Sequence, residues 1–324
     1  MTGRPLASAA LCAAALAIAG CATRGPVLPP LASAGVASRV EIDATPFFPQ
    51  RDYQCGPAAL ATVLVASGAE VTPDRLVPEV YLPGRRGSLQ PELVAAVRGQ
   101  GRLPYLLPPS DQLLLTTLAA GTPVLVLQKL GAGPWPGWHY AVVIGYDLPR
   151  DRLVLRSGTT RRQEMPAAHF LATWQRAGRW AMTVHQPGTL PADADFARYM
   201  EAAAGLEAVG RGDDALLAYE AAANKWPGES LPQLALANIA YARGDLAAAE
   251  RGFREAARLD PDDAAARNNR AETLRRMGCP SLARREIEVA RVLAGTGPLA
   301  AAVAATADKL AGEHTADAPG CPLD

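Results

Sequence analysis

The sequence predicts an α+β domain followed by an all-α repeat domain. Helical patterns come first over residues 41–188, and strands rich in β-branched residues follow them. Beyond residue 188, alanine-rich segments recur every 34 residues. A stretch rich in Pro and Gly at 186–191 separates the two compositions. Because 324 residues exceed what one compact core holds, we expect two domains.

Residues 1–21 have the form of a signal peptide, with an apolar stretch of small residues at 6–19. This stretch is too short to span a bilayer of about 30 Å comfortably, although an uncleaved anchor is the alternative. The segment ending in Cys21 resembles the cleavage box of bacterial lipoproteins, which implies a lipidated Cys21. By the same resemblance, Ala22 implies the outer membrane, facing the periplasm. Residues 22–40 are then a linker.

The α+β domain is predicted to contain three helices and four strands. We expect the helices at 56–67, near 90–99 and near 110–119, and the strands at 123–129, 139–146, 152–157 and 179–185. Short turns between the later strands indicate antiparallel pairing. The first helix is apolar throughout and is expected to pack against this sheet.

Cys55 stands where a loop turns into the first helix, and Gly56 and Pro57 suit a first helical turn. A free thiol has a pKa near 8.5, and the unpaired N–H groups and dipole at a helix N-terminus favour the thiolate. Cys55 is therefore the candidate nucleophile. Gln50 is the candidate donor to an oxyanion, a role worth roughly 2.7–4 kcal/mol, with Gln54 as the alternative.

His139 is the candidate base among four histidines, because it opens a strand after a loop rich in Gly, Pro and Trp. His169 and His185 are expected to serve structure, and His314 lies near a polar tail. A cysteine in a helix followed by a histidine in a strand is the chain order of papain-like peptidases.

The residue that orients His139 has to come from another strand. Asp147 lies about 26 Å along the same strand, at roughly 3.3 Å per residue, so it cannot reach the imidazole. The chain then reverses, and the strand at 152–157 returns antiparallel and brings Ser157 back toward His139. Ser157 can accept a hydrogen bond from the ring but carries no charge to stabilise an imidazolium.

These motifs resemble the papain-like family that trims double-glycine leader peptides from bacteriocins. The resemblance rests on Gln50 with the block at 54–60, on the strand at 121–126 and on the strand from His139 to Tyr146. Within that family, the chain is most similar to stand-alone lipoproteins with tetratricopeptide repeats behind the peptidase domain. The resemblance covers residues 41–188 and implies a Cys-His centre with Gln50 in the oxyanion hole. The usual Asp of the next strand is absent, and Ser157 takes approximately its place.

The repeat domain, residues 189–314, carries the signature of tetratricopeptide repeats. Three features recur 34 residues apart: an aromatic at 219 and 253, an alanine at 222 and 256, and a proline at 227 and 261. Gly212-Asp213 recurs as Gly244-Asp245 with a slip of two residues, and Gly278 continues at the regular spacing. We expect three units, a capping helix at 298–311 and a tail at 315–324. The concave surface either binds a peptide or protein partner or only packs on the first domain.

The five cysteines and the balanced charge limit which disulfides, metals, cofactors and partners the sequence predicts. Cys12 is removed with the signal, which leaves Cys279 and Cys321 as a candidate disulfide in an oxidising periplasm. No Cys or His cluster predicts a metal site, and no glycine-rich phosphate loop predicts another cofactor. The chain has 32 basic residues (Lys and Arg) and 32 acidic residues (Asp and Glu), so it has no excess positive charge that would favour binding to nucleic acid.

The first hypothesis is a lipid-anchored cysteine peptidase that hydrolyses peptide bonds through Cys55 and His139. Its repeats would recruit a peptide or protein substrate or a partner. A peptide-binding scaffold without hydrolysis is the second hypothesis, favoured by the missing Asp. An acyl transferase is the third, because transfer to an amine shares the acyl-cysteine stage. Thiol reactivity separates the scaffold from the two enzymes, and product analysis separates the enzymes.

Overall fold

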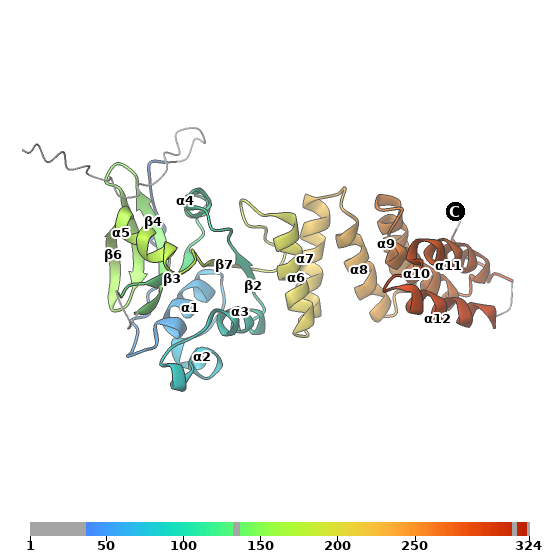
Figure 1. The fold of residues 1–324 in the computed structure, drawn as a ribbon, viewed down its shortest axis with the longest axis horizontal. Coiled ribbons are helices and arrows are strands. Elements are labelled where there is room, and N and C mark those ends of the chain that lie inside the picture. The colour runs from blue at the N-terminus through green and yellow to red at the C-terminus, as the bar shows by residue number, and fades with distance from the viewer. Residues whose placement is uncertain (1–36, 132–136, 313–315, 323–324) are drawn as a thin grey trace, which may run out of the picture.

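The computed structural model describes residues 37–131, 137–312 and 316–322 (Figure 1). A sheet covered by helices forms the first part, and a row of helices extends away from it. The predicted signal at 1–21 with Cys12 and Cys21, nearly all of the linker, and His314 lie outside the described residues. Among the described helices, none is both long enough and apolar enough to cross a membrane.

The first part contains the three expected helices and the four expected strands, with ends shifted by at most two residues. Its elements are β1 (Arg39–Glu41), α1 (Cys55–Ala66), α2 (Pro73–Val80), the 3₁₀ turn η1 (Pro83–Arg85), α3 (Gln90–Gly99), β2 (Leu103–Leu106), α4 (Asp111–Ala119), β3 (Val124–Lys129), β4 (Trp138–Asp147), β5 (Arg152–Ser157), β6 (Thr160–Pro166), α5 (Ala167–Gln175) and β7 (Ala181–His185). The sequence does not reveal β1, α2, β2, β6 or α5.

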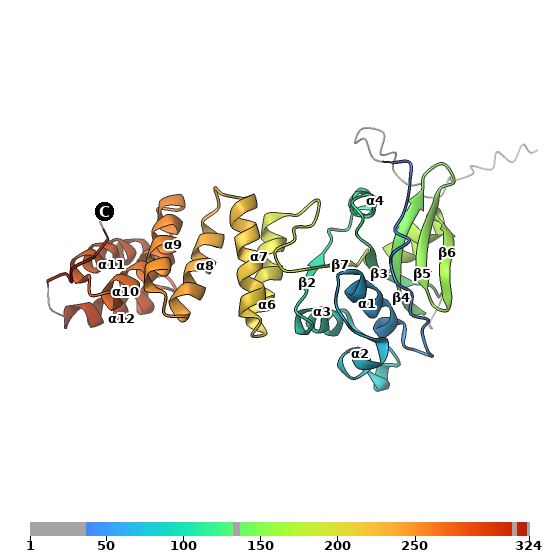
Figure 2. The same ribbon diagram turned by 180° about the vertical axis from the view of Figure 1, so that it is seen from behind.

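The strands form one sheet in the order β2-β7-β3-β4-β5-β6, and β1 pairs with the end of β4. Every pairing is antiparallel. The helices α1, α2 and α3 cover one face, whereas α4, α5 and α6 lie on the other (Figures 1 and 2). Along β3, side chains alternate between these two cores: Leu125 and Leu127 face α1, and Val124 and Val126 face the opposite side.

A break in the ladder lets β1 join the sheet. The register of β4 on β5 shifts between Val143 and Gly145. A Cβ on Gly145 would lie 2.2 Å from the Val40 carbonyl oxygen, so only glycine permits this approach. The shift also changes the alternation: Ile144 faces the α1 side, and Tyr146 two residues later faces the other core.

The repeat domain is a stack of helices that packs pair upon pair. Its elements are α6 (Phe196–Ala208), α7 (Gly212–Lys225), α8 (Ser230–Ala242), α9 (Leu246–Leu259), α10 (Ala264–Arg276), α11 (Pro280–Ala294) and α12 (Ala300–Ala311). Gly210, Gly244 and Gly278 follow the first helix of successive pairs, each with φ near +80°. They are spaced 34 residues apart, so the match of Gly212 to Gly244 is wrong and Gly210 is the equivalent residue.

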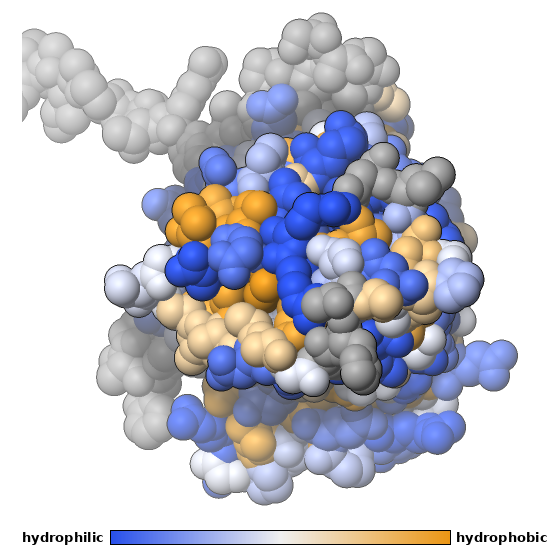
Figure 3. All heavy atoms as spheres, turned by 90° about the vertical axis from the view of Figure 1, so that its right-hand side faces the viewer, coloured by the Kyte–Doolittle hydropathy of each residue, from blue (hydrophilic) through white to orange (hydrophobic). Residues whose placement is uncertain are grey.

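The two domains share a core, because buried side chains of α6 and α7 join the sheet face that carries α4 and α5. At this junction the Asp195 N–H donates to the Tyr105 hydroxyl at 2.9 Å. At the far end, around α11 and α12, hydrophobic residues lie between hydrophilic ones (Figure 3). Val292 on that end is 75% exposed. The repeat stack is therefore fixed to the sheet at one end and presents a mixed surface at the other.

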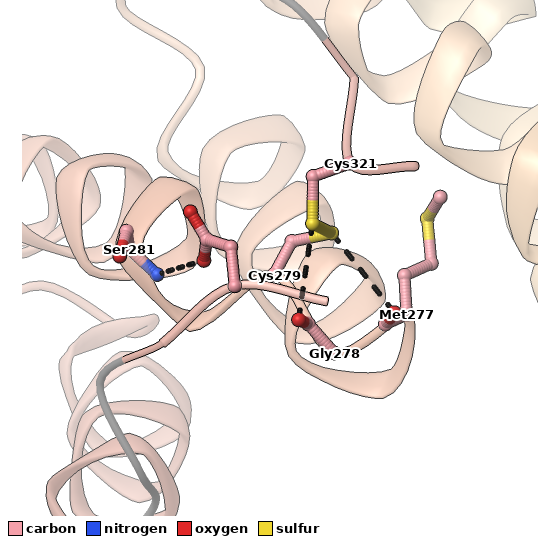
Figure 4. The surroundings of a disulfide bond; sticks show 6 residues. Met277, Gly278, Cys279, Ser281 and Cys321 are labelled. Atoms are coloured by element: carbon pink, nitrogen blue, oxygen red, sulfur yellow. Dashed lines mark hydrogen bonds between the residues drawn. A yellow bond between two sulfur atoms is a disulfide. The ribbon is translucent and has the colours of Figure 1, made fainter. Parts of the chain in front are cut away.

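A disulfide between Cys279 and Cys321 fastens the tail to the last pair of helices (Figure 4). The Cα atoms of the two residues are 5.7 Å apart, within the usual range. Around it, the Ala318 N–H donates to the Gly278 carbonyl, and the Ser281 N–H donates to Asp317, both at 2.8 Å. Asp317 thereby accepts from an N–H group in the first turn of α11.

Candidate active site

Cys55 is the first residue of α1, and the turn around it requires a small neighbour. A Cβ on Gly56 would lie 2.2 Å from the Ser88 hydroxyl oxygen, so glycine lets the loop before α3 pack against the start of α1. Pro57 occupies the first turn, where N–H groups have no partner within the helix, so its missing N–H costs no hydrogen bond. From Gly56 to Leu64 the helix is buried, which fixes the position of the cysteine at its N-terminus.

The free thiol of Cys55 has its pKa set by two opposing effects. Burial raises the pKa and is the larger effect, while backbone hydrogen bonds from Tyr140, Gly56 and Cys55 itself lower it. The expectation that the helix N-terminus leaves a lowered pKa is therefore wrong, because the sequence does not reveal how deeply the thiol is buried. The resting group is a thiol that needs a base.

His139 lies at the start of β4, opposite Gln128 of β3. Its Nε2 is 2.9 Å from the Ser157 hydroxyl oxygen. Burial lowers the pKa of the His139 ring, so the imidazole is neutral at neutral pH. When Nε2 carries the ring proton, its N–H donates a hydrogen bond to the Ser157 hydroxyl, and Nδ1 is left as an acceptor. The ring is then ready to take a proton from another group.

The start of β4 also contacts the nucleophile. The backbone of Tyr140, the residue after His139, forms a hydrogen bond with the Cys55 sulfur. The Tyr140 side chain packs edge-on against Trp180, and its hydroxyl donates to the Ser88 carbonyl at 3.4 Å. The strand that carries the histidine is thereby fixed to both the helix start and the loop before α3.

Gln50 shares a narrow pocket with Cys55 and Ser157. Its backbone N–H donates to the Gly158 carbonyl at 3.1 Å, which ties the segment before α1 to the turn after Ser157. The Oε1 atom of Gln50 is buried and forms no hydrogen bond. Gln54 directly precedes the helix, its side chain does not cap it, and it lines a separate hollow on the other side of Gln50. Gln50 is therefore the carboxamide that the pocket presents beside the thiol.

Arg156 is a site residue that the sequence analysis missed. Its buried guanidinium donates to the carbonyl oxygens of Asp43, Thr45 and Arg161, at 2.7–3.3 Å. It thus joins the segment that leads to Gln50 with the hairpin that carries Ser157. Burial lowers its pKa. A basic residue next to Ser157 in a strand was the only available signal, and it does not distinguish a buried residue from an exposed one.

The remaining candidates lie elsewhere. Asp147 forms an ion pair with Arg39 at 2.7 Å, at the far end of β4 from His139. His185 is buried in β7, where Nε2 is 2.8 Å from the Thr183 hydroxyl and burial lowers its pKa to about 4. His169 lies on α5. Within the ranges that the structure describes, no group of three or more His, Cys, Asp or Glu side chains is placed to hold a metal ion.

No family model matches the sequence, and no curated protein matches it. Among solved structures, a putative C39-like peptidase from Bacillus anthracis is 18% identical, with 46% of this chain and 98% of that chain covered and a TM-score of 0.39. The peptidase domain of Streptococcus ComA is 21% identical over 44% of this chain and 98% of its own, with a TM-score of 0.36.

The helical part of the chain has its own similarities. The type III secretion translocator chaperone SycD of Yersinia enterocolitica is 19% identical, covering 36% of this chain and 83% of its own, with a TM-score of 0.34. These three solved structures, two peptidases and one chaperone, each match only part of this chain.

Proposed function

We propose that the chain is a cysteine peptidase that cleaves peptide bonds through Cys55. The observation that carries this proposal is the arrangement of Gln50, Cys55 and Ser157 around one pocket, with His139 bound to Ser157. A thiol, a neutral imidazole and a carboxamide are the three groups that acyl transfer needs.

The reaction begins when the Cys55 sulfur attacks the carbonyl carbon of the peptide and its proton passes to His139. The Cys55 backbone N–H and the Gln50 side-chain amide stabilise the oxyanion. His139 then gives the proton to the leaving amine, and the acyl-cysteine remains. Water, deprotonated by His139, releases the acid and restores the thiol. Ser157 accepts the hydrogen bond from Nε2 and holds the ring throughout.

We propose further that the protein is anchored in the outer membrane through a lipidated Cys21 and faces the periplasm. The disulfide between Cys279 and Cys321 supports an oxidising compartment. In this arrangement the repeat domain, which shares a core with the sheet, holds a peptide or protein partner in a fixed position relative to Cys55.

A peptide-binding scaffold is the second candidate function. The uncharged Ser157 and the raised pKa of Cys55 favour it, because both slow the formation of a thiolate. An acyl transferase uses the same first step but passes the acyl group to an amine instead of water.

Cleavage of a proteome-derived peptide library by the full chain in ¹⁸O-labelled water separates these functions. Hydrolysis puts ¹⁸O into new carboxyl termini, and transfer yields amides when an amine is added. Gln50→Ala is expected to lower kcat about 10²–10³-fold, whereas Gln54→Ala, the matched carboxamide, leaves it nearly unchanged. Products that persist in Cys55→Ala would contradict the proposal, and so would an absence of any product from the wild type.

A further inference from the structure

Large apolar side chains are exposed close in sequence to both Cys55 and His139. Within the described residues of the first domain, four are at least 38% exposed: Tyr53, Leu106, Leu130 and Trp138. Tyr53 lies two residues before Cys55, and Trp138 directly precedes His139. Leu130 follows β3 at the base of the same hairpin, where its N–H donates to the Gly137 carbonyl. Three of the four therefore flank the catalytic residues.

The first of these flanks, here called the cysteine lip, consists of Tyr53 and Arg86. The Arg86 guanidinium lies over the Tyr53 ring, 5.6 Å from its centroid. Both residues adopt positive φ angles, 61° and 47°, and only four non-glycine residues of the described chain do so. Such strained backbones concentrate at functional sites. Ser88, two residues after Arg86, packs against Gly56, so this lip adjoins the start of α1.

The second flank, the histidine lip, consists of Lys129 and Trp138. They are directly opposite each other on β3 and β4. The Lys129 ammonium lies 5.6 Å from the centre of the Trp138 ring, which is 53% exposed. An exposed aromatic ring with a basic side chain over it thus lies close in sequence to Cys55, and a second such pair lies next to His139.

Positive charge predominates on the two lips. Five basic side chains lie on or beside them, and three acidic ones do: Arg51, Arg85, Arg86, Lys129 and Arg176, against Asp52, Asp74 and Glu92. Arg51 is paired with Asp74 at 3.0 Å. In the described part of the chain, neither Arg86 nor Lys129 forms an ion pair. This excess is local, since the chain as a whole has a net charge of zero.

We propose that the two lips clamp an acidic polypeptide across Cys55, with apolar side chains of the peptide against the aromatic rings and its carboxylates beside Arg86 and Lys129. The inference rests on the proposed function, because it names the substrate class of the same site. Exposed aromatic faces bind apolar side chains, and the unpaired cations above them select acidic neighbours. The occupant is a peptide in extended conformation, since it has to lie across the nucleophile between the lips.

The charge of the lips is testable without a substrate. Alkylation of Cys55 in the full chain is compared for iodoacetate, an anion, and iodoacetamide, a neutral reagent of similar size. We expect the ratio of the iodoacetate rate to the iodoacetamide rate to be higher for Cys55 than for free cysteine, and to fall as the salt concentration rises. Arg86→Glu and Lys129→Glu should each lower the ratio roughly threefold to tenfold. Arg276→Glu removes a similar cation 4.7 Å from the Tyr241 ring and should change nothing.

Peptide binding tests the substrate class directly. Two fluorescent decapeptides that contain leucine and either glutamate or lysine are titrated against the full chain with Cys55→Ala. We expect the glutamate peptide to bind at least tenfold more tightly, and both Tyr53→Ala and Trp138→Ala to weaken it. Leu106→Ala, an exposed apolar side chain away from the lips, is the matched control.

The outcomes distinguish this inference from the proposed function. Equal binding of the two peptides, or a ratio of alkylation rates that Arg86→Glu and Lys129→Glu leave unchanged, overturns the clamp even if the wild type hydrolyses peptides. Charge-selective binding without any hydrolysis upholds the clamp and refutes the peptidase. Self-association of the chain that depends on Tyr53 and Trp138 would show that a second copy occupies the lips, and would also overturn the inference.

Discussion

Replacing Ser157 is the sharpest test of how His139 is held, because one contact of 2.9 Å joins them. A hydrogen bond from a charged imidazolium is worth roughly 1.5–3 kcal/mol, against about 0.5–1.5 kcal/mol from a neutral ring. The difference of about 1 kcal/mol favours the protonated ring. Ser157→Ala should therefore lower the pKa of His139 by roughly 0.7 below its already lowered value.

Ser157→Asp should act in the opposite direction. A carboxylate at this position favours the imidazolium and is expected to raise the pKa of His139 by roughly 1–3. The assay is an NMR titration of the histidine ring protons, which is tractable because the chain has four histidines. His139→Gln identifies the resonance to follow, because its signal disappears. If neither Ser157 variant moves the His139 titration, Ser157 does not orient the ring.

Three further predictions concern stability. The pKa of His185 is about 4 in the folded protein and 6.5 for an ordinary histidine, so its contribution to the free energy of unfolding is complete above pH 6.5 and falls by about 3 kcal/mol as the pH drops to 4. Urea unfolding between pH 4 and pH 6.5 measures this loss, and His185→Gln should flatten the pH dependence of stability. Reductant should destabilise the wild type by roughly 2–4 kcal/mol, and the double variant Cys279→Ser with Cys321→Ser should lose that sensitivity. Gly145→Ala should cost roughly 1–3 kcal/mol in thermal unfolding because its Cβ meets the β1 backbone, whereas Gly228→Ala, with open space around it, should be neutral.

Sequence patterns predicted the parts of the fold whose signals are local. The helix after Cys55 and the strand after His139 are apolar and uninterrupted, so periodicity and composition located them. β2 and β6 escaped notice because both are edge strands: β2 contains Pro104, and β6 carries charged side chains from Arg161 to Glu164. Edge strands tolerate proline and charge, so they lack the pattern of a buried strand.

The site was predictable where chain reversal alone brings residues together. The hairpin that returns Ser157 toward His139 follows from turn residues and strand lengths. The pKa of Cys55 was not predictable, because it depends on burial by segments distant in sequence. Arg156 was missed for the same reason: two of its three carbonyl partners, Asp43 and Thr45, lie more than 100 residues away, beyond any local pattern.

The central claim, that His139 removes the proton of Cys55, is tested most directly by the pH dependence of Cys55 alkylation by iodoacetamide. With a raised thiol pKa and a lowered imidazole pKa, the wild type should show a rate plateau that begins below pH 6.5, where His139 becomes neutral. His139→Ala should abolish the plateau, slow the reaction at pH 7 by at least about tenfold, and leave only the limb from ionisation of the thiol, which burial moves above the ordinary range of a free thiol. Identical profiles for the two proteins would contradict the account.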